Sequence, residues 1–264
     1  MTEYSYPLLH NRTYKNLRHE IARAGRKSAP RDLPILELLG KVAWFYAGEV
    51  VGRVGLNSKL GFTEGLALVA GLADESWIKA AAPSVDLSLY GSFAYYGPMA
   101  AGQYEGVLDE LRRDPNSRRA VIVLAGSNDL TSTGLPCTLA LQFFIRNGDL
   151  YTLAHMRSSD SVLGVPYDVM QFGMLALCVA RVLRVRAFAV GLSMGSSHTY
   201  IGARSEDLHS FPESKYFGLM DSVPTDWPGV VGWAKGNLDQ QAGWLPSRLP
   251  DGVVMLRGPG GRHL

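Results

Sequence analysis

Residues 134–168 carry the sequence GLPCTLALQFFIRNGDLYTLAHMRSSDSVLGVPYD, in which two strand-like runs are joined by Asn147-Gly148. An Asn-Gly pair between two apolar runs is a strong signal for a two-residue hairpin turn. Such a turn places the start of the first strand beside the end of the second. We therefore expect Cys137 and Arg157 to lie close together at one end of a sheet, although twenty positions separate them.

The composition is that of a globular chain. Its 264 residues are 47% hydrophobic and 19% charged, enough apolar sequence for a sizeable core. A net charge of +2 gives no strong field favouring nucleic acid or membrane as partner, and we expect no run of transmembrane length. Because the chain has only two cysteines, Cys137 and Cys178, we expect reduced thiols and a cytoplasmic location. We find no repeat or linker and predict one domain, residues 1–264.

Apolar spacing predicts several helices. Residues 13–25 predict a helix with Leu17, Ile21 and Ala24 on its apolar face. Residues 166–183 are apolar nearly all round, which predicts a helix buried in the centre of the fold. Two further helices are predicted at residues 60–71 and 102–113.

The other segments predict strands and loops. KVAWFYAGEVVGRV, residues 41–54, predicts one long strand, and residues 88–102, rich in Gly and Tyr, predict an ordered loop. The tail from Pro224 onward has no clear periodicity. Two further strands are predicted at residues 120–126 and 186–194.

A thiol among arginines indicates a site that binds an anionic small molecule and attacks it. The thiolate is the effective nucleophile, and nearby arginines lower its pKa. The pair Arg157-Ser158 and the pair Arg118-Arg119 suit a phosphate, because the guanidinium fork matches phosphate oxygens. Two arginines at a strand entrance are also ordinary surface charge, so spacing alone leaves both interpretations open.

Several other polar residues have an ordinary structural interpretation beside a functional one. Glu64 is the one charge in its helix; it faces water in the ordinary case and is a general base if it faces a pocket. His198 and Tyr200 project to the same side of an extended segment, where a lone histidine is more often structural. Arg31 belongs to a basic loop that spacing alone assigns to solvent. Cys178 lies in the apolar helix and is most simply core.

Some cofactor classes have no motif here. Without CxxC or HxxxH spacing we expect no metal site. Without GxGxxG or a P-loop we expect neither a Rossmann cofactor nor nucleoside triphosphate hydrolysis.

Four motifs together resemble the thymidylate synthase family: SRR at 117–119, PC at 136–137, RSSDSVLGVPYD at 157–168 and HTY at 198–200. Their order and spacing agree with the family. The resemblance implies an α+β fold, with a twisted mixed sheet around a buried central helix, and a homodimer. It also implies a pyrimidine nucleoside monophosphate as substrate and 5,10-methylenetetrahydrofolate as co-substrate, with no metal.

The resemblance assigns binding roles residue by residue. The folate would lie beside Asp160, Gly164 and Tyr167, and the sugar hydroxyl beside His198 and Tyr200. The residues implied for the phosphate are Arg31, Arg157 and Ser158 of one subunit with Arg118 and Arg119 from its partner.

The resemblance also implies the chemistry. The thiolate of Cys137 would add to pyrimidine C6, and C5 would attack the one-carbon unit of the folate. Glu64 would handle proton transfers with ordered water. The Tyr-Gly loop would bring Tyr96, in preference to Tyr90, to the catalytic site. Hydride would then give a methyl group, and water a hydroxymethyl group.

Departures from the family pattern indicate which branch of the family the chain resembles. Asp168 stands where synthases that act on uracil have Asn; a carboxylate accepts from the cytosine amino group, and a shared proton satisfies N3. Drift at a tolerant position is the alternative, but mismatched buried polar groups cost about 1–3 kcal/mol each. Thr138 replaces a common His, and the GPGGRHL terminus differs from the family's apolar closure over folate. Asp168 and Thr138 resemble the cytidylate and deoxycytidylate hydroxymethylases, whereas the terminus leaves open how the site excludes solvent.

Sugar preference and pathway stay open at this level. Related phage enzymes act on dCMP in DNA modification, and a related enzyme of nucleoside-antibiotic biosynthesis acts on CMP. A composition rich in Ala, Gly, Arg and Val suggests a source with a high-GC genome, and this favours the enzyme type that acts on CMP. The competing hypotheses are a thymidylate synthase that methylates dUMP and a non-catalytic nucleotide- or RNA-binding homologue. A generic thiol hydrolase is disfavoured, since no suitable His–Asp pair accompanies the thiol.

Overall fold

The computed structural model describes residues 12–85, 96–126, 135–202, 210–219, 221–239, 247–248 and 253–256. At its centre is the expected hairpin, formed by β5 (Thr138–Arg146) and β6 (Asp149–Asp160). Asn147 and Gly148 make the turn with φ angles of 53° and 81°, the left-handed conformation that a two-residue hairpin turn requires. Thr138 pairs with Met156, so the predicted neighbours Cys137 and Arg157 do lie side by side.

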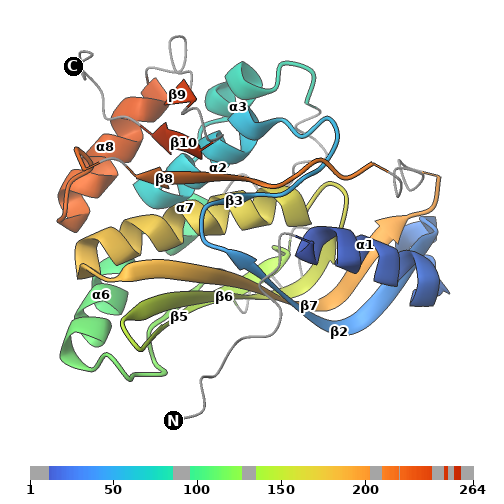
Figure 1. Cartoon of the computed structure of the whole chain (residues 1–264), viewed down its shortest axis with the longest axis horizontal. Helices are drawn as coiled ribbons and strands as arrows, with labels where there is room; N and C mark the ends of the chain where they lie inside the picture. The colour runs from blue at the N-terminus through green and yellow to red at the C-terminus, as the bar shows by residue number, and fades with distance from the viewer. Residues whose placement is uncertain are drawn as a thin grey trace.

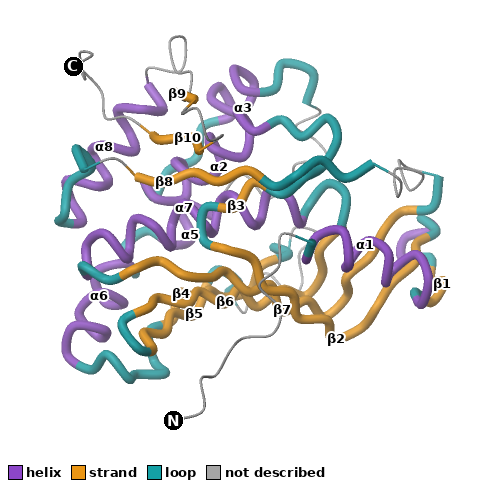
Figure 2. Tube along the Cα trace, in the orientation of Figure 1, coloured by secondary structure: helices purple, strands orange, loops and turns teal. Residues whose placement is uncertain are grey.

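The hairpin belongs to a six-stranded sheet in the order β1-β2-β7-β6-β5-β4. Only the β6–β7 pair is parallel, so the sheet is mixed, as predicted. Figures 1 and 2 show the sheet along one side of the molecule, with most helices above it. Its other strands are β1 (Arg26–Ser28), β2 (Ile35–Tyr46), β4 (Val121–Val123) and β7 (Arg186–Tyr200).

Helix α7 (Val165–Leu183) is the buried central helix that the sequence predicts. It contacts β6 and β7 of the large sheet on one side and α2 (Ser58–Ala70) on the other (Figure 1). Among the described residues it is the one helix long and apolar enough to cross a membrane by length and composition, which corrects our expectation that no run reaches that length. Since 83% of its apolar window is buried, these properties suit a core helix.

Helix α2 packs closely on α7 because two glycines face it. A Cβ added at Gly61 would lie 2.7 Å from Met170 Sδ, and one at Gly65 would lie 2.8 Å from Met174 Cβ. Only glycine permits this approach of the two helices. The close packing fixes the position of Glu64, which lies between the two glycines in sequence.

The predicted long strand at 41–54 is wrong. The chain leaves β2 after Tyr46, turns at Gly48 with φ 82°, and starts β3 (Glu49–Val50) in a second sheet. That sheet has the order β3-β8-β10-β9, with β8 (Lys215–Leu219), β9 (Ser247–Arg248) and β10 (Val253–Leu256). Apolar residues on both sides of Gly48 concealed the turn, although a glycine inside a strand pattern often marks a bend.

Other sequence predictions need smaller corrections. The loop predicted at 88–102 contains a helix, α5 (Tyr96–Ala100), while residues 86–95 lie outside the described part. The tail contains α8 (Trp227–Asp239), whose spaced glycines concealed its periodicity. In α1 (Thr13–Ala24), Leu17 and Ile21 are buried as expected, but Ala24 is exposed. The remaining helices are α3 (Glu75–Ala81), α6 (Tyr104–Arg113) and the 3-10 turn η1 (Pro30–Asp32).

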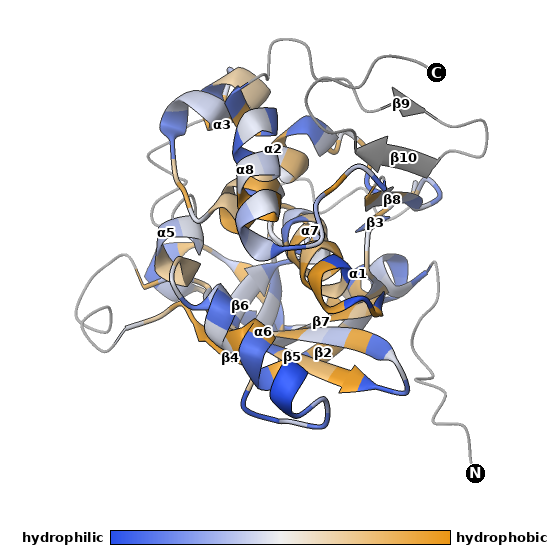
Figure 3. Ribbon diagram, turned by 90° about the vertical axis from the view of Figure 1, so that its left-hand side faces the viewer, coloured by the Kyte–Doolittle hydropathy of each residue, from blue (hydrophilic) through white to orange (hydrophobic). Residues whose placement is uncertain are grey.

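One face of the six-stranded sheet is not covered by the described helices (Figures 1 and 3). Trp44 and Tyr151 contact there with ring centroids 6.3 Å apart, and Phe188 continues the aromatic row. Val42 on the same strand as Trp44 is 41% exposed. The apolar side chains on this face suit contact with another surface.

Candidate active site

The thiol lies where the hairpin strands end. Cys137 directly precedes β5, and its carbonyl accepts the N–H of Arg157 at 2.8 Å. Its sulfur is 3.6 Å from Ser158 Oγ. The guanidinium of Arg157 donates to the carbonyls of Leu135 and Pro136 and to Ser158 Oγ, at 2.7–3.3 Å. The structure therefore brings together the predicted nucleophile Cys137 and two of the residues predicted for the phosphate, Arg157 and Ser158.

Arginines do lower the thiol pKa, but burial outweighs them. Desolvation raises the pKa of Cys137 above its ordinary value, while the Ser158 hydrogen bond and the charges of Arg157 and Arg31 pull it down. This corrects the expectation of a thiol made acidic by arginine. The thiol is thus mainly protonated near neutral pH and must lose its proton as it attacks.

Asp168 is buried in the first turn of α7 and held at both oxygens. Ser159 Oγ donates to Oδ2 at 2.9 Å, and Gln171 Nε2 donates to Oδ1 at 3.1 Å. The pKa of Asp168 is raised to about 7, mainly by burial; the hydrogen bonds from Ser159 and Gln171 lower it, and the charge of Asp160 raises it. The carboxyl is therefore poised between its neutral and ionised forms at physiological pH. No sequence pattern points to Ser159 as a partner of Asp168, whereas Gln171 follows Asp168 at the i,i+3 helix spacing.

Tyr96 is tied to the thiol segment. Its hydroxyl accepts the backbone N–H of Thr138 at 3.0 Å, and its ring contacts Phe172 of α7. Burial raises the pKa of Tyr96, with the charges of Asp168 and Cys137 adding to the effect. Tyr96 therefore lies at the cluster that the sequence predicts, whereas Tyr90 falls outside the described residues.

The residues predicted for sugar and folate meet on neighbouring strands. Asp160 pairs with His198 across β6 and β7. The rings of His198 and Tyr200 meet edge to face, with centroids 5.3 Å apart. Burial raises the pKa of Asp160, and His198 opposes this. Gly164 donates its N–H to the Asp160 carbonyl at 2.8 Å, so β6 turns into α7 at this point.

Two arginines that the sequence motifs do not include lie near the residues predicted for the folate: Arg53 beside Tyr167, and Arg18 within electrostatic reach of Asp160. The guanidinium of Arg53 lies 5.7 Å from the Tyr167 ring centroid and donates to the carbonyl of Val162 at 2.9 Å. Arg18 is 3% exposed, and its charge lowers the pKa of Asp160. The sequence pattern of α1 predicts only an apolar face, and nothing in that pattern indicates that Arg18 is buried.

Two predicted residues come from segments outside the hairpin. Arg31 lies in η1 with φ 54° and is exposed, and its charge reaches Cys137. Glu64 on α2 is half-buried, and its Oε2 atom is enclosed. The ordinary interpretation of a carboxylate that faces water is therefore wrong for Glu64.

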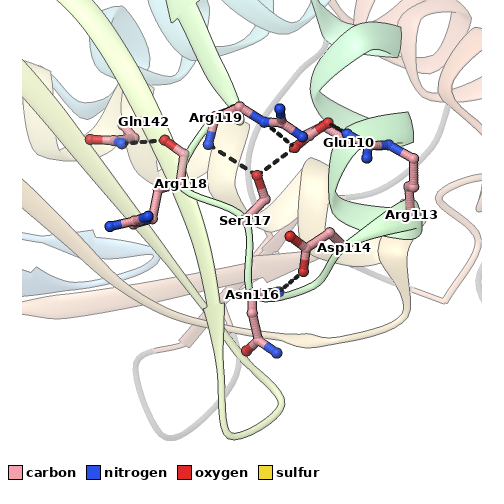
Figure 4. A network of polar contacts seen from close by, with 8 residues as sticks. All are labelled: Glu110, Arg113, Asp114, Asn116, Ser117, Arg118, Arg119 and Gln142. Atoms are coloured by element: carbon pink, nitrogen blue, oxygen red, sulfur yellow. Dashed lines mark hydrogen bonds and ion pairs between the residues drawn. The ribbon is translucent and has the colours of Figure 1, made fainter.

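The two arginines before β4, Arg118 and Arg119, make different contacts (Figure 4). Arg119 donates from Nε to Glu110 Oε1 at 3.1 Å, and Ser117 Oγ donates to the same oxygen at 2.5 Å. Arg118 contributes its carbonyl to Gln142 at 2.9 Å, while its exposed guanidinium points away from this network. The structure thus leaves Arg118 extended and anchors Arg119 within its own chain.

The cluster combines a nucleophile, a tunable carboxyl, hydroxyl groups and cationic side chains. Such a set can hold an anionic substrate and add a thiol to it. Within the described ranges, no group of three His, Cys, Asp or Glu residues could hold a metal ion.

Comparison with known proteins finds similarity to thymidylate synthases. A model described as thymidylate synthase matches residues 82–212, which include Cys137, Asp168 and His198 but not Arg31 or Glu64. A thymidylate synthase of Ascaris suum is 29% identical over 142 residues, covering 51% of this chain and 48% of that protein. A bifunctional dihydrofolate reductase-thymidylate synthase of Zea mays is 29% identical over 127 residues, covering 47% of this chain and 24% of that protein. The chain thus spans about half or less of these relatives.

Proposed function

We propose that this protein transfers the one-carbon unit of 5,10-methylenetetrahydrofolate to C5 of CMP or dCMP, because residues 82–212 match a family model described as thymidylate synthase. Water then gives a 5-hydroxymethyl product and tetrahydrofolate. The observation that carries the choice of cytosine is the buried carboxyl of Asp168, which Ser159 and Gln171 hold at its two oxygens and whose pKa is about 7.

Covalent addition at C6 is the first step. Cys137 loses its proton as its sulfur bonds to C6, which makes C5 nucleophilic. Arg157 and Ser158 lie beside the sulfur, where they suit the nucleotide phosphate. The guanidinium of Arg31 adds a further positive charge within electrostatic reach of Cys137. The enclosed carboxyl of Glu64 suits the transfer of the C5 proton.

The one-carbon unit ends as an alcohol. The folate supplies a methylene group, and its departure as tetrahydrofolate leaves an exocyclic double bond at C5. Water adds its oxygen to that carbon, and the Cys137 sulfur leaves C6 to restore the aromatic base. The atoms balance, because nucleotide, methylenetetrahydrofolate and water give hydroxymethyl nucleotide and tetrahydrofolate. Asp160, Gly164 and Tyr167, gathered where β6 enters α7, suit the folate.

We also propose a homodimer that joins through the open face of the six-stranded sheet. Val42 and the aromatic row that begins at Trp44 give this face its apolar character. Arg118 is tied by its carbonyl to Gln142 and extends its guanidinium outward, which suits a reach into the partner's phosphate site. Arg119 would support Arg118 from its contact with Glu110.

Mixing two inactive variants tests the shared site. Arg118→Ala and Cys137→Ala should each lose turnover as homodimers. A mixed dimer assembled from the two has one site with an intact thiol and an intact Arg118, so about half of the wild-type activity should return in that fraction. Failure of any mixture to recover turnover, with mixed dimers detected by native mass spectrometry, would contradict a shared site.

Folate products separate the two enzymatic hypotheses. Hydroxymethylation releases tetrahydrofolate, whereas methylation of dUMP oxidises the folate to dihydrofolate, which is measured by its absorbance. We expect CMP or dCMP to be consumed without dihydrofolate. Dihydrofolate formed in step with dUMP consumption would establish the thymidylate synthase alternative, which the family match fits equally well.

A binding protein without turnover is the other alternative. Cys137→Ala should abolish turnover and leave nucleotide binding measurable by calorimetry, because the arginines remain. Cys178→Ala is the matched control, since Cys178 is buried within α7. Turnover that survives in Cys137→Ala would refute the covalent mechanism.

A further inference from the structure

Asp168 is held by two side chains of different kinds. Ser159 donates a hydroxyl hydrogen to Oδ2, and Gln171 donates an amide hydrogen to Oδ1. All three residues are more than nine-tenths buried, with exposures of 8% for Asp168, 3% for Ser159 and 7% for Gln171. Each carboxyl oxygen therefore has its own donor. Because the group is buried, water does not exchange with these donors and make the two oxygens equivalent.

The location of one proton decides which base a neutral carboxyl matches. Cytosine needs an acceptor opposite its amino group and a donor opposite N3, whereas uracil needs a donor opposite O4 and an acceptor opposite N3–H. A neutral carboxyl offers one donor and one acceptor, so it fits either base, depending on which oxygen is protonated. A donor that binds one oxygen favours the proton on the other oxygen.

We propose that Ser159 and Gln171 are positioning residues that set base specificity by fixing which oxygen of Asp168 carries the proton. The inference rests on the proposed function, because it takes Asp168 as the residue that contacts the pyrimidine. Neither Ser159 nor Gln171 needs to touch the nucleotide. The two donors act on opposite oxygens, so their removal has opposite consequences.

The surroundings of Asp168 keep its proton available. Burial places the pKa of Asp168 near neutrality, and Asp160 on β6 raises it. Cys137 and Tyr96 are the other titratable groups within electrostatic reach, and burial favours the neutral form of both. Within the described residues, no arginine or lysine contacts the carboxyl directly, so a neutral Asp168 is not opposed by a paired cation.

The test compares Ser159→Ala with Gln171→Leu. The ratio of kcat/KM for CMP to kcat/KM for dUMP is measured for each variant, with circular dichroism to follow folding. We expect the ratio to move in opposite directions, by about tenfold each, which corresponds to the loss of one buried hydrogen bond. Ser159→Thr keeps the hydroxyl and should restore the wild-type ratio.

Two results would overturn the inference. Ratios that stay constant while both rates fall would make the pair merely structural, and ratios that move in the same direction would exclude control of the proton. If Gln171→Leu does not fold, Ser159→Ala compared with Ser159→Thr decides the question alone. A wild-type protein that binds no pyrimidine nucleotide in calorimetry would instead refute the proposed function, which separates the two failures.

Discussion

Replacing Asp168 by Asn should remove a large part of the pH dependence of stability. The buried carboxyl has a pKa of about 7 in the folded chain, against an ordinary value of 3.8. Since its folded pKa is raised, the neutral form stabilises the fold fully below pH 3.8, and this contribution is lost as the pH rises through 7. Asn has nearly the same shape, does not titrate and can still accept from Ser159.

The size of the effect follows from the two pKa values. Each pKa unit corresponds to about 1.4 kcal/mol, so ionising this carboxyl in place costs about 4 kcal/mol once the pH is well above 7. Between pH 5 and pH 8, the wild type should lose about 2–3 kcal/mol of unfolding free energy relative to Asp168→Asn. Burial is the main cause, and the charge of Asp160 contributes to it.

Urea unfolding at a series of pH values measures this difference. The exposed Asp239→Asn variant is the matched control and should follow the wild-type curve. A difference between wild type and Asp168→Asn that stays constant from pH 5 to pH 8 would refute the idea that Asp168 is held neutral by burial.

Three further substitutions test buried contacts in the fold, and the third, Gly55→Ala, is the control for the second, Gly48→Ala. Tyr96→Phe removes the acceptor of the buried Thr138 N–H, so we expect a loss of about 1–3 kcal/mol in urea unfolding; unchanged stability would show that the contact contributes nothing. Gly48→Ala puts a Cβ 2.3 Å from Phe217 O at φ 82°, and should cost about 2–4 kcal/mol. Gly55→Ala, at φ 68° with open space around it, should cost only about 1 kcal/mol; equal losses at the two glycines would contradict the role assigned to close packing.

Local signals in the sequence were enough for the hairpin and the central helix. Asn147-Gly148 allows few conformations, and its left-handed turn determines the pairing that brings Cys137 to Arg157. The helix Val165–Leu183 followed from its apolar character, because no surface face interrupts it. The family motifs then identified the positions of Asp160 and its neighbours, whose roles stay predictions.

The missed features depend on contacts between distant segments. The turn at Gly48 follows from the approach of Phe217, which lies in a strand of the second sheet. The burial of Arg18 and the hold of Ser159 on Asp168 likewise join elements that are separate in sequence. The pKa of Cys137 was expected to fall because the arginines were visible in the sequence, whereas its degree of burial was not.

The most direct test of cytosine hydroxymethylation is one reaction in ¹⁸O-labelled water. Equal concentrations of CMP, dCMP and dUMP are supplied with 5,10-methylenetetrahydrofolate, and the nucleotides are analysed by mass spectrometry. We expect a 5-hydroxymethylcytosine nucleotide that carries ¹⁸O in its new hydroxyl group, with dUMP left unchanged. A methylated uracil nucleotide without the label would contradict it.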